Sequence, residues 1–434
     1  MSSSFVVACV GKPSAGKSSF LNAVSDAVAK VGNYPFTTIE PNKGVAYYKV
    51  LPNALAEGWH IIILINRFQK EHLCKPRHGK CIMGNRYIPI QMLDVAGLVP
   101  GASEGKGLGN QFLDDLRHAS VLVHVVDASG STNEKGEATV GYDPSNDIKW
   151  LISEIHAWIF NNLKKNWPNV VRRHNAKSST LEETLQNQWS GYGATPLHTI
   201  KVLVLLSGKI PENISIWDDT SLNCLVETFI KVRFPMIIAL NKADLTESNH
   251  YIENLYNLYP EYTMIVCSAL AETFLRKLDK QGFLAYVDGT DTFYTLDNAE
   301  LVPKGYNKPM KELDERTKSR LEKVQDLVLY RFGNTGVQEV IQSAVELGDM
   351  IPVYPVSNIN NFTSGDQYVF RDVILTHSST RIKDISRKIG AINFTSVVTI
   401  GNVQISDFCL FLDRMSHAGS GLYMNFIILS EQNN

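Results

Sequence analysis

Residues 11–18 read Gly11-Lys12-Pro13-Ser14-Ala15-Gly16-Lys17-Ser18 and fit the phosphate-loop pattern G-x-x-x-x-G-K-[ST]. An apolar run at 5–10 precedes them and predicts a strand, and apolar residues at helical spacing follow them. In such a loop, successive backbone N–H groups surround phosphate oxygens, and the helix that follows directs its positive dipole end at the same anion. The sequence therefore predicts that the chain binds a nucleoside triphosphate. Lys17 would reach the β- and γ-phosphates, and Ser18 would bind magnesium.

Asn241-Lys242-Ala243-Asp244 follows a second apolar run, at 235–240, and so lies at the carboxyl end of an expected parallel strand. The Asp244 carboxylate can accept hydrogen bonds from both the ring N1–H and the exocyclic amino group of guanine, whereas adenine offers the wrong pattern. We expect Asn241 to brace the loop and Lys242 to lie along the base. In this order after a phosphate loop, the motif predicts GTP rather than ATP.

Asp94-Val95-Ala96-Gly97 lies between these two motifs, after the strand-like residues 88–93. We expect Asp94 to hold magnesium through water and the Gly97 N–H to contact the γ-phosphate, so that this loop is a switch. Upstream, Thr37 and Thr38 stand where a first switch loop would complete the magnesium shell. Thr38 is the favoured ligand and Thr37 the alternative.

Residues 33–42, residues 94–117 and the stretch Tyr330 to Val340 resemble the Obg branch of the translation-factor-related GTPases, within it the YchF type. The resemblance covers most of residues 1–390. It implies a G domain that is interrupted by a helical, coiled-coil-like insertion and followed by a small β-grasp TGS domain. Ser268-Ala269-Leu270 looks like the final guanine-side loop of this family, in which backbone amides meet the base oxygen.

The expected sites are thus defined residue by residue. Catalysis is assigned to Lys17, Asp94 and Gly97, and the magnesium ligands are Ser18 and Thr38. The nucleotide would be contacted by Gly11, Lys12, Pro13, Ser14, Ala15, Gly16, Lys17, Ser18, Ser19, Asp94, Val95, Ala96, Gly97, Leu98, Asn241, Lys242, Asp244, Ser268, Ala269 and Leu270.

The expected fold is α/β, with a mainly parallel, doubly wound sheet. Residues 1–130 would form the first part of the G domain, residues 131–232 the helical insertion and residues 233–350 the second part. Residues 351–434 would form the TGS-like domain, although no match to its strands is found after Gly390. The buried run Val121 to Asp127 contains His124, which we interpret as a core histidine rather than a catalyst.

Leu98 follows the switch glycine at the position where Ras-like enzymes place a glutamine that orients the attacking water. An aliphatic side chain cannot do this, so slow hydrolysis that a partner accelerates is expected. Ser14 replaces an asparagine that helps related enzymes hold potassium, which puts a potassium requirement in doubt. Two alternatives stay open. The chain is either a GTPase switch or a nucleotide-gated binding module with negligible turnover, and an ATP-using homologue is a further alternative.

The composition fits a soluble intracellular protein of several domains. The chain has 434 residues, Lys plus Arg 42 against Asp plus Glu 44, and six cysteines in the scattered pattern of a reducing compartment. We expect a cytoplasmic monomer without DNA or membrane partners, and we leave a nuclear pool open. The basic stretch between Lys164 and Lys177 contains no acidic residue. It is either a contact for ribosomal RNA or the solvated face of a helix.

Two features fit no motif. His72, Cys74, His78 and Cys81 have zinc-ligand types but cramped spacing, so a zinc site is a minor hypothesis. Two stretches depart from the family, residues 59–67 and the chain after Gly390. A misassigned exon boundary, a retained intron or ordinary divergence would each explain this. Peptide mass spectrometry across these stretches distinguishes the explanations.

Overall fold

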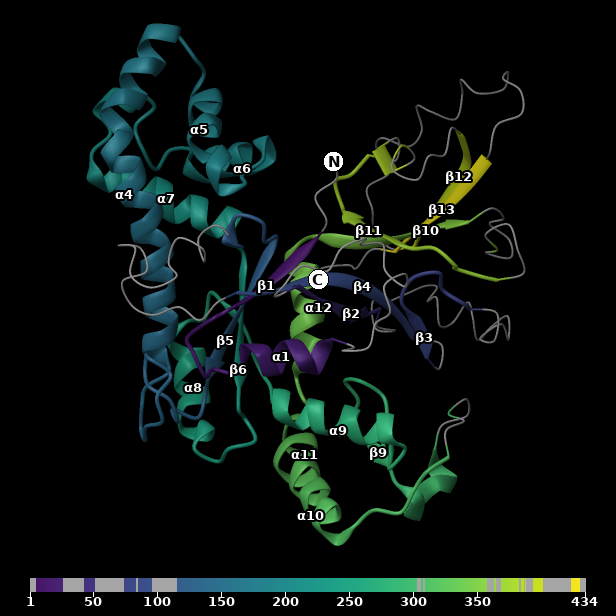
Figure 1. The fold of residues 1–434 in the computed structure, drawn as a ribbon. Helices are drawn as coiled ribbons and strands as arrows, with labels where there is room; N and C mark the ends of the chain where they lie inside the picture. Colours follow the sequence, from purple (N-terminus) through teal and green to yellow (C-terminus); the bar gives the residue numbers. More distant parts are fainter. Residues whose placement is uncertain are drawn as a thin grey trace.

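A computed structural model describes most of the chain. It covers residues 5–25, 43–50, 74–82, 85–95, 115–302, 306, 309–356, 363, 368–381, 384–385, 387, 393–400 and 423–429, the last two ranges as backbone. The structure is built around one central sheet, with helices on both of its faces (Figure 1).

The central sheet has the strand order β2-β4-β1-β5-β6-β7, and β3 pairs with the edge of β4. Strands β4, β1, β5, β6 and β7 run parallel, whereas β2 and β3 are antiparallel to β4. The expected mainly parallel, doubly wound sheet is therefore confirmed. Its strands are β1 (Val6–Val10), β2 (Lys43–Lys49), β3 (Lys80–Ile82), β4 (Asn85–Asp94), β5 (Val121–Asp127), β6 (Met236–Asn241) and β7 (Thr263–Val266).

Alternate residues of the parallel strands point to opposite faces of the sheet, and each face is covered by helices. On β1, Val7 and Cys9 join a core with α1 (Lys17–Val24) and α12 (Val337–Leu347), whereas Val6 and Ala8 join a core with the helices on the other face. The phosphate loop lies between β1 and α1. It is thus held at the carboxyl edge of the sheet by strand and helix together.

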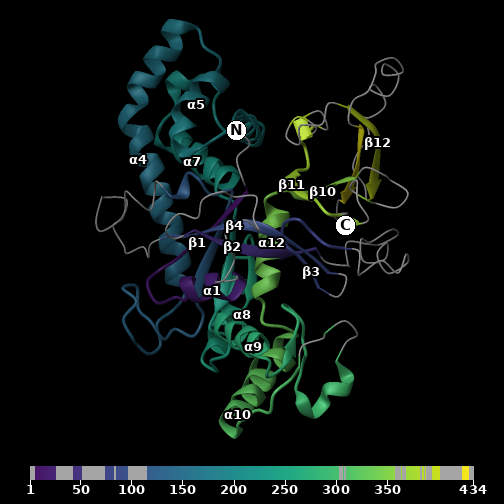
Figure 2. The same cartoon turned by 45° about the vertical axis from the view of Figure 1, so that its right-hand side comes forward.

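Four helices separate β5 from β6 and lie to one side of the sheet in Figures 1 and 2. The longest of them, α4, continues through Pro168 to Lys177, so the basic stretch of the sequence lies on a helix. Packing stabilises the helix around this proline, since Trp167 stacks on Trp217 with ring centroids 5.4 Å apart. The helices of this region are α4 (Ser145–Lys177), α5 (Leu181–Trp189), α6 (Pro196–Leu206) and α7 (Asp219–Arg233).

The second half of the chain adds further helices and a second sheet. In that sheet, which has the order β11-β10-β13-β12, β10 is antiparallel to both of its neighbours and β12 is parallel to β13. The helices are α8 (Ser248–Leu258), α9 (Ala269–Gln281), α10 (Glu315–Val324), a π-helical turn (Gln325–Leu329) and α11 (Tyr330–Phe332), and the strands are β8 (Ala285–Tyr286), β9 (Phe293–Tyr294), β10 (Met350–Val356), β11 (Ile374–His377), β12 (Asn393–Ile400) and β13 (Tyr423–Leu429).

In the stretch 369–377, a strand of the second sheet forms only from Ile374 onward. Val369 forms only an isolated bridge with Thr363, and Phe370 has a positive φ of 47°, which interrupts an extended chain. The TGS domain stays a prediction, as does the division of the chain into domains.

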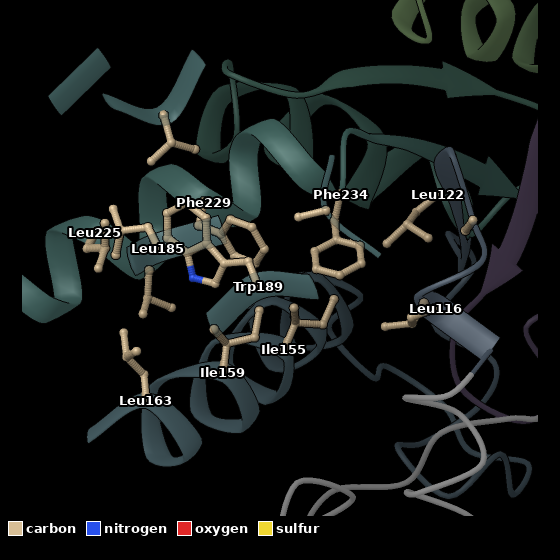
Figure 3. Close-up of a cluster of buried hydrophobic side chains, with 14 of the residues drawn as sticks. Leu116, Leu122, Ile155, Ile159, Leu163, Leu185, Trp189, Leu225, Phe229 and Phe234 are labelled. Carbon is tan, nitrogen blue, oxygen red and sulfur yellow. The ribbon is translucent and has the colours of Figure 1, made fainter. Parts of the chain in front are cut away.

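Aromatic packing holds the helical region between β5 and β6 together. Trp189, at the end of α5, is 1% exposed and stacks on Phe229 of α7 with ring centroids 4.3 Å apart. Figure 3 shows Trp189 lying between Phe229 and the aliphatic side chains of α4, including Ile159. Trp189 therefore joins three helices of this region.

Trp189→Ala should lower the free energy of unfolding by about 3–5 kcal/mol, because a large cavity is left where the surrounding helices cannot fully collapse. Urea denaturation followed by circular dichroism measures the change. Leu197→Ala, at a side chain of α6 that is 59% exposed, is the control and should change the value by less than about 0.5 kcal/mol. Equal losses in the two variants would contradict this packing.

Candidate nucleotide-binding site

The phosphate loop has the backbone conformation that its glycines permit. Gly11 has φ +142° and Gly16 has φ +101°, values that side-chain-bearing residues rarely adopt. A Cβ atom at Gly11 would lie 2.5 Å from the Val125 carbonyl oxygen, and one at Gly16 would lie 2.3 Å from the Asn241 side-chain nitrogen. Both positions therefore exclude any other residue.

Lys17, the first residue of α1, is folded back across the loop. Its ammonium group donates hydrogen bonds to the carbonyl oxygens of Gly11 at 3.0 Å and Lys12 at 2.9 Å. Burial lowers the pKa of Lys17, and the nearby Asp94 carboxylate opposes this shift. The charge thus lies inside the loop, where a phosphate group would be attracted to it.

Ser18 and Asp94 meet across the edge of the sheet. The Ser18 hydroxyl donates to Asp94 Oδ2 at 2.7 Å, because β4 lies next to β1 and brings Asp94 opposite Cys9 in the register. A hydroxyl and a carboxylate oxygen are hard donors of the kind that magnesium prefers. The two side chains therefore fit a magnesium site of the expected composition.

Asn241 connects the phosphate loop with the loop after β7. It is 3% exposed, and its side-chain NH₂ group donates to the Ala15 carbonyl oxygen at 3.0 Å. Its side-chain oxygen accepts from the Ala269 backbone N–H, also at 3.0 Å. Three of the four stretches that were expected to contact the nucleotide are thus brought together by one side chain.

Asp244 is positioned by the same loop. The Ser268 hydroxyl donates to Asp244 Oδ1 at 2.7 Å and also accepts from the Ala271 N–H at the start of α9. Oδ1 is therefore held in place by Ser268. Leu270 is exposed beside it.

Lys242 points toward β5. Its ammonium group forms an ion pair with the buried Asp127 at 2.8 Å and donates to the Ser131 hydroxyl at 3.2 Å. Burial would raise the pKa of Asp127, but hydrogen bonds from Lys242, Ser129 and Thr132 outweigh it and hold the pKa below its usual value. The sequence placed Lys242 along the base and did not reveal this partner.

The side chain of Lys12 has buried partners outside the phosphate loop. Its ammonium group lies 2.8 Å from Asp147 Oδ2, donates to the Thr132 carbonyl oxygen at 2.6 Å and sits 4.0 Å from the centroid of the Tyr142 ring. Lys12 and Asp147 are 1% and 2% exposed. Sequence reasoning missed this buried pair, which connects the phosphate loop to the first turn of α4.

The remaining residues of the expected site divide into two groups. Pro13, Ser14, Ser19 and Val95 lie in or beside the loops just described, and Ser14 has a positive φ of 60°. The expected residues Thr38, Ala96, Gly97 and Leu98 lie outside the described residues. Thr37 lies outside them as well, and so do residues 59–67.

His124 lies in the core, as expected, at 0% exposure on β5 beneath the phosphate loop. Burial lowers the pKa of His124 to about 3, and the charges of Lys17 and Lys12 act in the same direction. The side chain is therefore neutral at physiological pH. Neither ring nitrogen has a hydrogen-bond partner within the part of the chain that the structure describes.

A second feature that the sequence did not reveal is a cavity of about 400 Å³ beside Asp244, between α9 and the segment formed by α10 and the π-helical turn. Apolar side chains form most of its wall, and Arg320 and Lys323 line it as well.

The zinc hypothesis stays untested, because His72 lies outside the described residues. Within those residues, no group of three or more His, Cys, Asp or Glu side chains could hold a metal.

No helix among the described residues is long and apolar enough to cross a membrane.

Comparisons with known proteins identify the family. Residues 239–358 match the model of the Obg-like GTPase YGR210-like, G4 motif-containing domain, and residues 6–153 match that of the 50S ribosome-binding GTPase family. The uncharacterized GTP-binding protein C428.15 of Schizosaccharomyces pombe is 46% identical over 94% of this chain and 95% of its own.

Two archaeal proteins are similar over nearly the same length. The uncharacterized GTP-binding protein MJ1332 of Methanocaldococcus jannaschii is 37% identical over 88% of this chain and 90% of its own. The crystal structure of a GTP-binding protein from Pyrococcus horikoshii covers 89% of each chain with 30% identity and a TM-score of 0.63. The chain therefore belongs to the Obg-like P-loop GTPases, the family to which its motifs pointed.

Proposed function

We propose that this protein binds GTP, hydrolyses it slowly to GDP and phosphate, and acts as a nucleotide-dependent switch on ribosomes. The observation that carries the proposal is the position of Asn241, which fixes the phosphate loop and the base-side loop relative to each other through Ala15 and Ala269. A single nucleotide can then contact both loops at once.

The choice of base rests on Asp244. Because Ser268 holds Oδ1, the carboxylate has a defined orientation in which it can accept from N1–H and the exocyclic amino group of guanine. ATP offers no such pair of donors, so the carboxylate would receive no hydrogen bonds from the base. This supports GTP as the nucleotide.

The chemistry that these residues support is positioning and charge stabilisation. The glycines of the phosphate loop let backbone N–H groups approach the β- and γ-phosphates, and Lys17 supplies a positive charge there. Ser18 and, through water, Asp94 would hold magnesium, with Thr38 as the expected third ligand. A bound magnesium ion would neutralise charge on the phosphate oxygens. The Gly97 N–H would contact the γ-phosphate.

Slow hydrolysis follows from Leu98, which cannot orient the attacking water. The same residue favours a second candidate function, a nucleotide-gated binding module with negligible turnover. The two candidates share GTP binding and differ only in sustained phosphate release.

The ribosome is proposed as partner because residues 6–153 match a family described as ribosome-binding and because α4 has a basic surface. We define this surface by its five exposed basic residues, Lys164, Lys165, Arg172, Arg173 and Lys177. Lys164 is paired with Asp219 at 2.5 Å, and among the described residues Arg172 donates only to the neutral Asn169. A surface of this charge can bind the phosphates of ribosomal RNA.

Asp244→Asn should weaken GTP binding by about a hundred-fold or more and improve binding of xanthosine triphosphate. The reason is that the new amide group donates a hydrogen bond where the carboxylate accepted one, and the C2 carbonyl oxygen of xanthine can accept it. Competition titrations with GTP, ATP and xanthosine triphosphate measure this change. Lys17→Ala is the control and should weaken the binding of all three nucleotides. Equal affinity of the wild-type protein for GTP and ATP would overturn the assignment of the base.

Phosphate release by the wild-type protein, measured with GTP and with ATP, with and without ribosomes, tests the activity itself. We expect slow release from GTP that ribosomes accelerate. Tight GTP binding without release under any condition would support the gated module instead.

The double variant Arg172→Glu/Arg173→Glu should weaken ribosome binding. It should also reduce the magnitude of the slope of log binding constant against log salt concentration by about one to two, since each phosphate contact contributes roughly one. Sedimentation with ribosomes at several salt concentrations measures the slope. The matched control is Lys209→Glu/Lys231→Glu, an equal change of charge at exposed positions of the same helical region. A similar loss in both variants would show that the α4 surface has no specific role.

A further inference from the structure

A hairpin formed by residues 129–142, between β5 and α4, lies against the phosphate loop. Its strands are held by hydrogen bonds from Thr139 N to Ser131 O and from Tyr142 N to Gly130 O. At its tip, Asn133 Oδ1 accepts from the backbone N–H groups of Lys135 and Glu137, both at 3.0 Å. The tip is therefore a closed turn with a defined backbone.

The tip touches the phosphate loop directly at Gly136. A Cβ atom added to Gly136 would lie 2.6 Å from Pro13 Cβ and 2.8 Å from the Pro13 carbonyl oxygen. Gly136 also has a positive φ of 81°. No side chain fits there, so the backbone of the tip packs on the middle of the loop that would surround the phosphates.

Two lysines of the nucleotide motifs hold the base of this hairpin. Lys12 of the phosphate loop binds the Thr132 carbonyl oxygen and Asp147, and Lys242 of the base-side motif binds Asp127 and Ser131. The charge of each lysine is thus matched by a buried carboxylate. Neither ammonium group is available to a triphosphate, so Lys17 would have to act without their help.

Lys135 lies next to Gly136 on the tip and is exposed. Within the described part of the chain, its side chain forms no hydrogen bond or ion pair, in contrast to those of Lys12 and Lys242. A lysine carries its charge on a long, flexible stem. From a turn that contacts Pro13, this ammonium group can extend over the phosphate side of the loop.

We propose that Lys135 supplies, from within the same chain, a positive charge to the γ-phosphate of bound GTP. The inference rests on the proposed function and assigns a further residue to the same site. In hydrolysis, the oxygen of water bonds to the γ-phosphorus and the bond to the β–γ bridging oxygen breaks, with its electron pair remaining on GDP. The proton of water goes to the released phosphate. Lys135 stabilises the negative charge on the transferred group, as an arginine supplied in cis does in other GTPases.

The test compares Lys135→Ala with Lys135→Arg and with Glu134→Ala, a change at the neighbouring exposed residue of the same turn. The readouts are single-turnover GTP hydrolysis and the ratio of affinities for the slowly hydrolysed analogue GTPγS and for GDP. Lys135→Ala should slow hydrolysis by about ten-fold or more and lower this ratio, with GDP affinity unchanged, because only the γ-phosphate loses its partner. Lys135→Arg should restore most of the rate, and Glu134→Ala should not slow hydrolysis.

Gly136→Val provides an independent variant, since its side chain would push the tip away from Pro13. It should lower the GTPγS to GDP affinity ratio as Lys135→Ala does, while the melting temperature reports whether the fold is retained. One outcome would overturn the role of Lys135 alone. In it, the wild-type protein binds GTP, and the hydrolysis rate and the affinity ratio of Lys135→Ala stay within about two-fold of the wild-type values. Wild-type protein that binds neither GTP nor GDP would overturn the proposed function, and this inference with it.

Discussion

The rest of the site depends on two hydrogen bonds made by the carboxamide group of Asn241. One end of this group donates to the Ala15 carbonyl oxygen and the other accepts from the Ala269 N–H, in surroundings that leave the side chain 3% exposed. A buried carboxamide with both ends paired has one orientation, because any rotation would leave a donor or an acceptor without a partner. Two loops from opposite halves of the chain are thereby fixed at one separation.

Charge at the site is distributed by a second set of buried contacts. The phosphate-loop and base-side motifs contain three lysines, and two of them are paired with carboxylates that lie beneath or beside the hairpin. Among the described residues, the third, Lys17, donates hydrogen bonds only to backbone carbonyl oxygens of the phosphate loop. Two of the lysines thus hold parts of the protein together, and the third is the one to which the proposed function assigns contact with the phosphates. His124, neutral between Lys12 and Lys17, adds no charge to this arrangement.

The sequence predicted those features that depend on local pattern. The run from Val121 to Asp127 is a fully buried strand, as its mostly apolar sequence predicts, and the phosphate loop is recognisable because its glycines and Lys17 are close in the chain. The contact of Lys12 with Asp147 depends on the tertiary fold, which no local pattern records. The continuation of α4 past Pro168 also depends on the tertiary fold, since proline disfavours a helix locally and the stacking of Trp167 on Trp217 compensates for it.

The burial of Lys12 against Asp147 has a consequence for how the sequences of this family can diverge. Replacing Lys12 alone would leave a carboxylate buried without its partner, and replacing Asp147 alone would leave a buried ammonium group, each at a large cost in stability. Replacing both by apolar residues of similar volume would remove both charges together. Positions 12 and 147 should therefore change as a pair among relatives, and a relative that lacks one charge should lack the other.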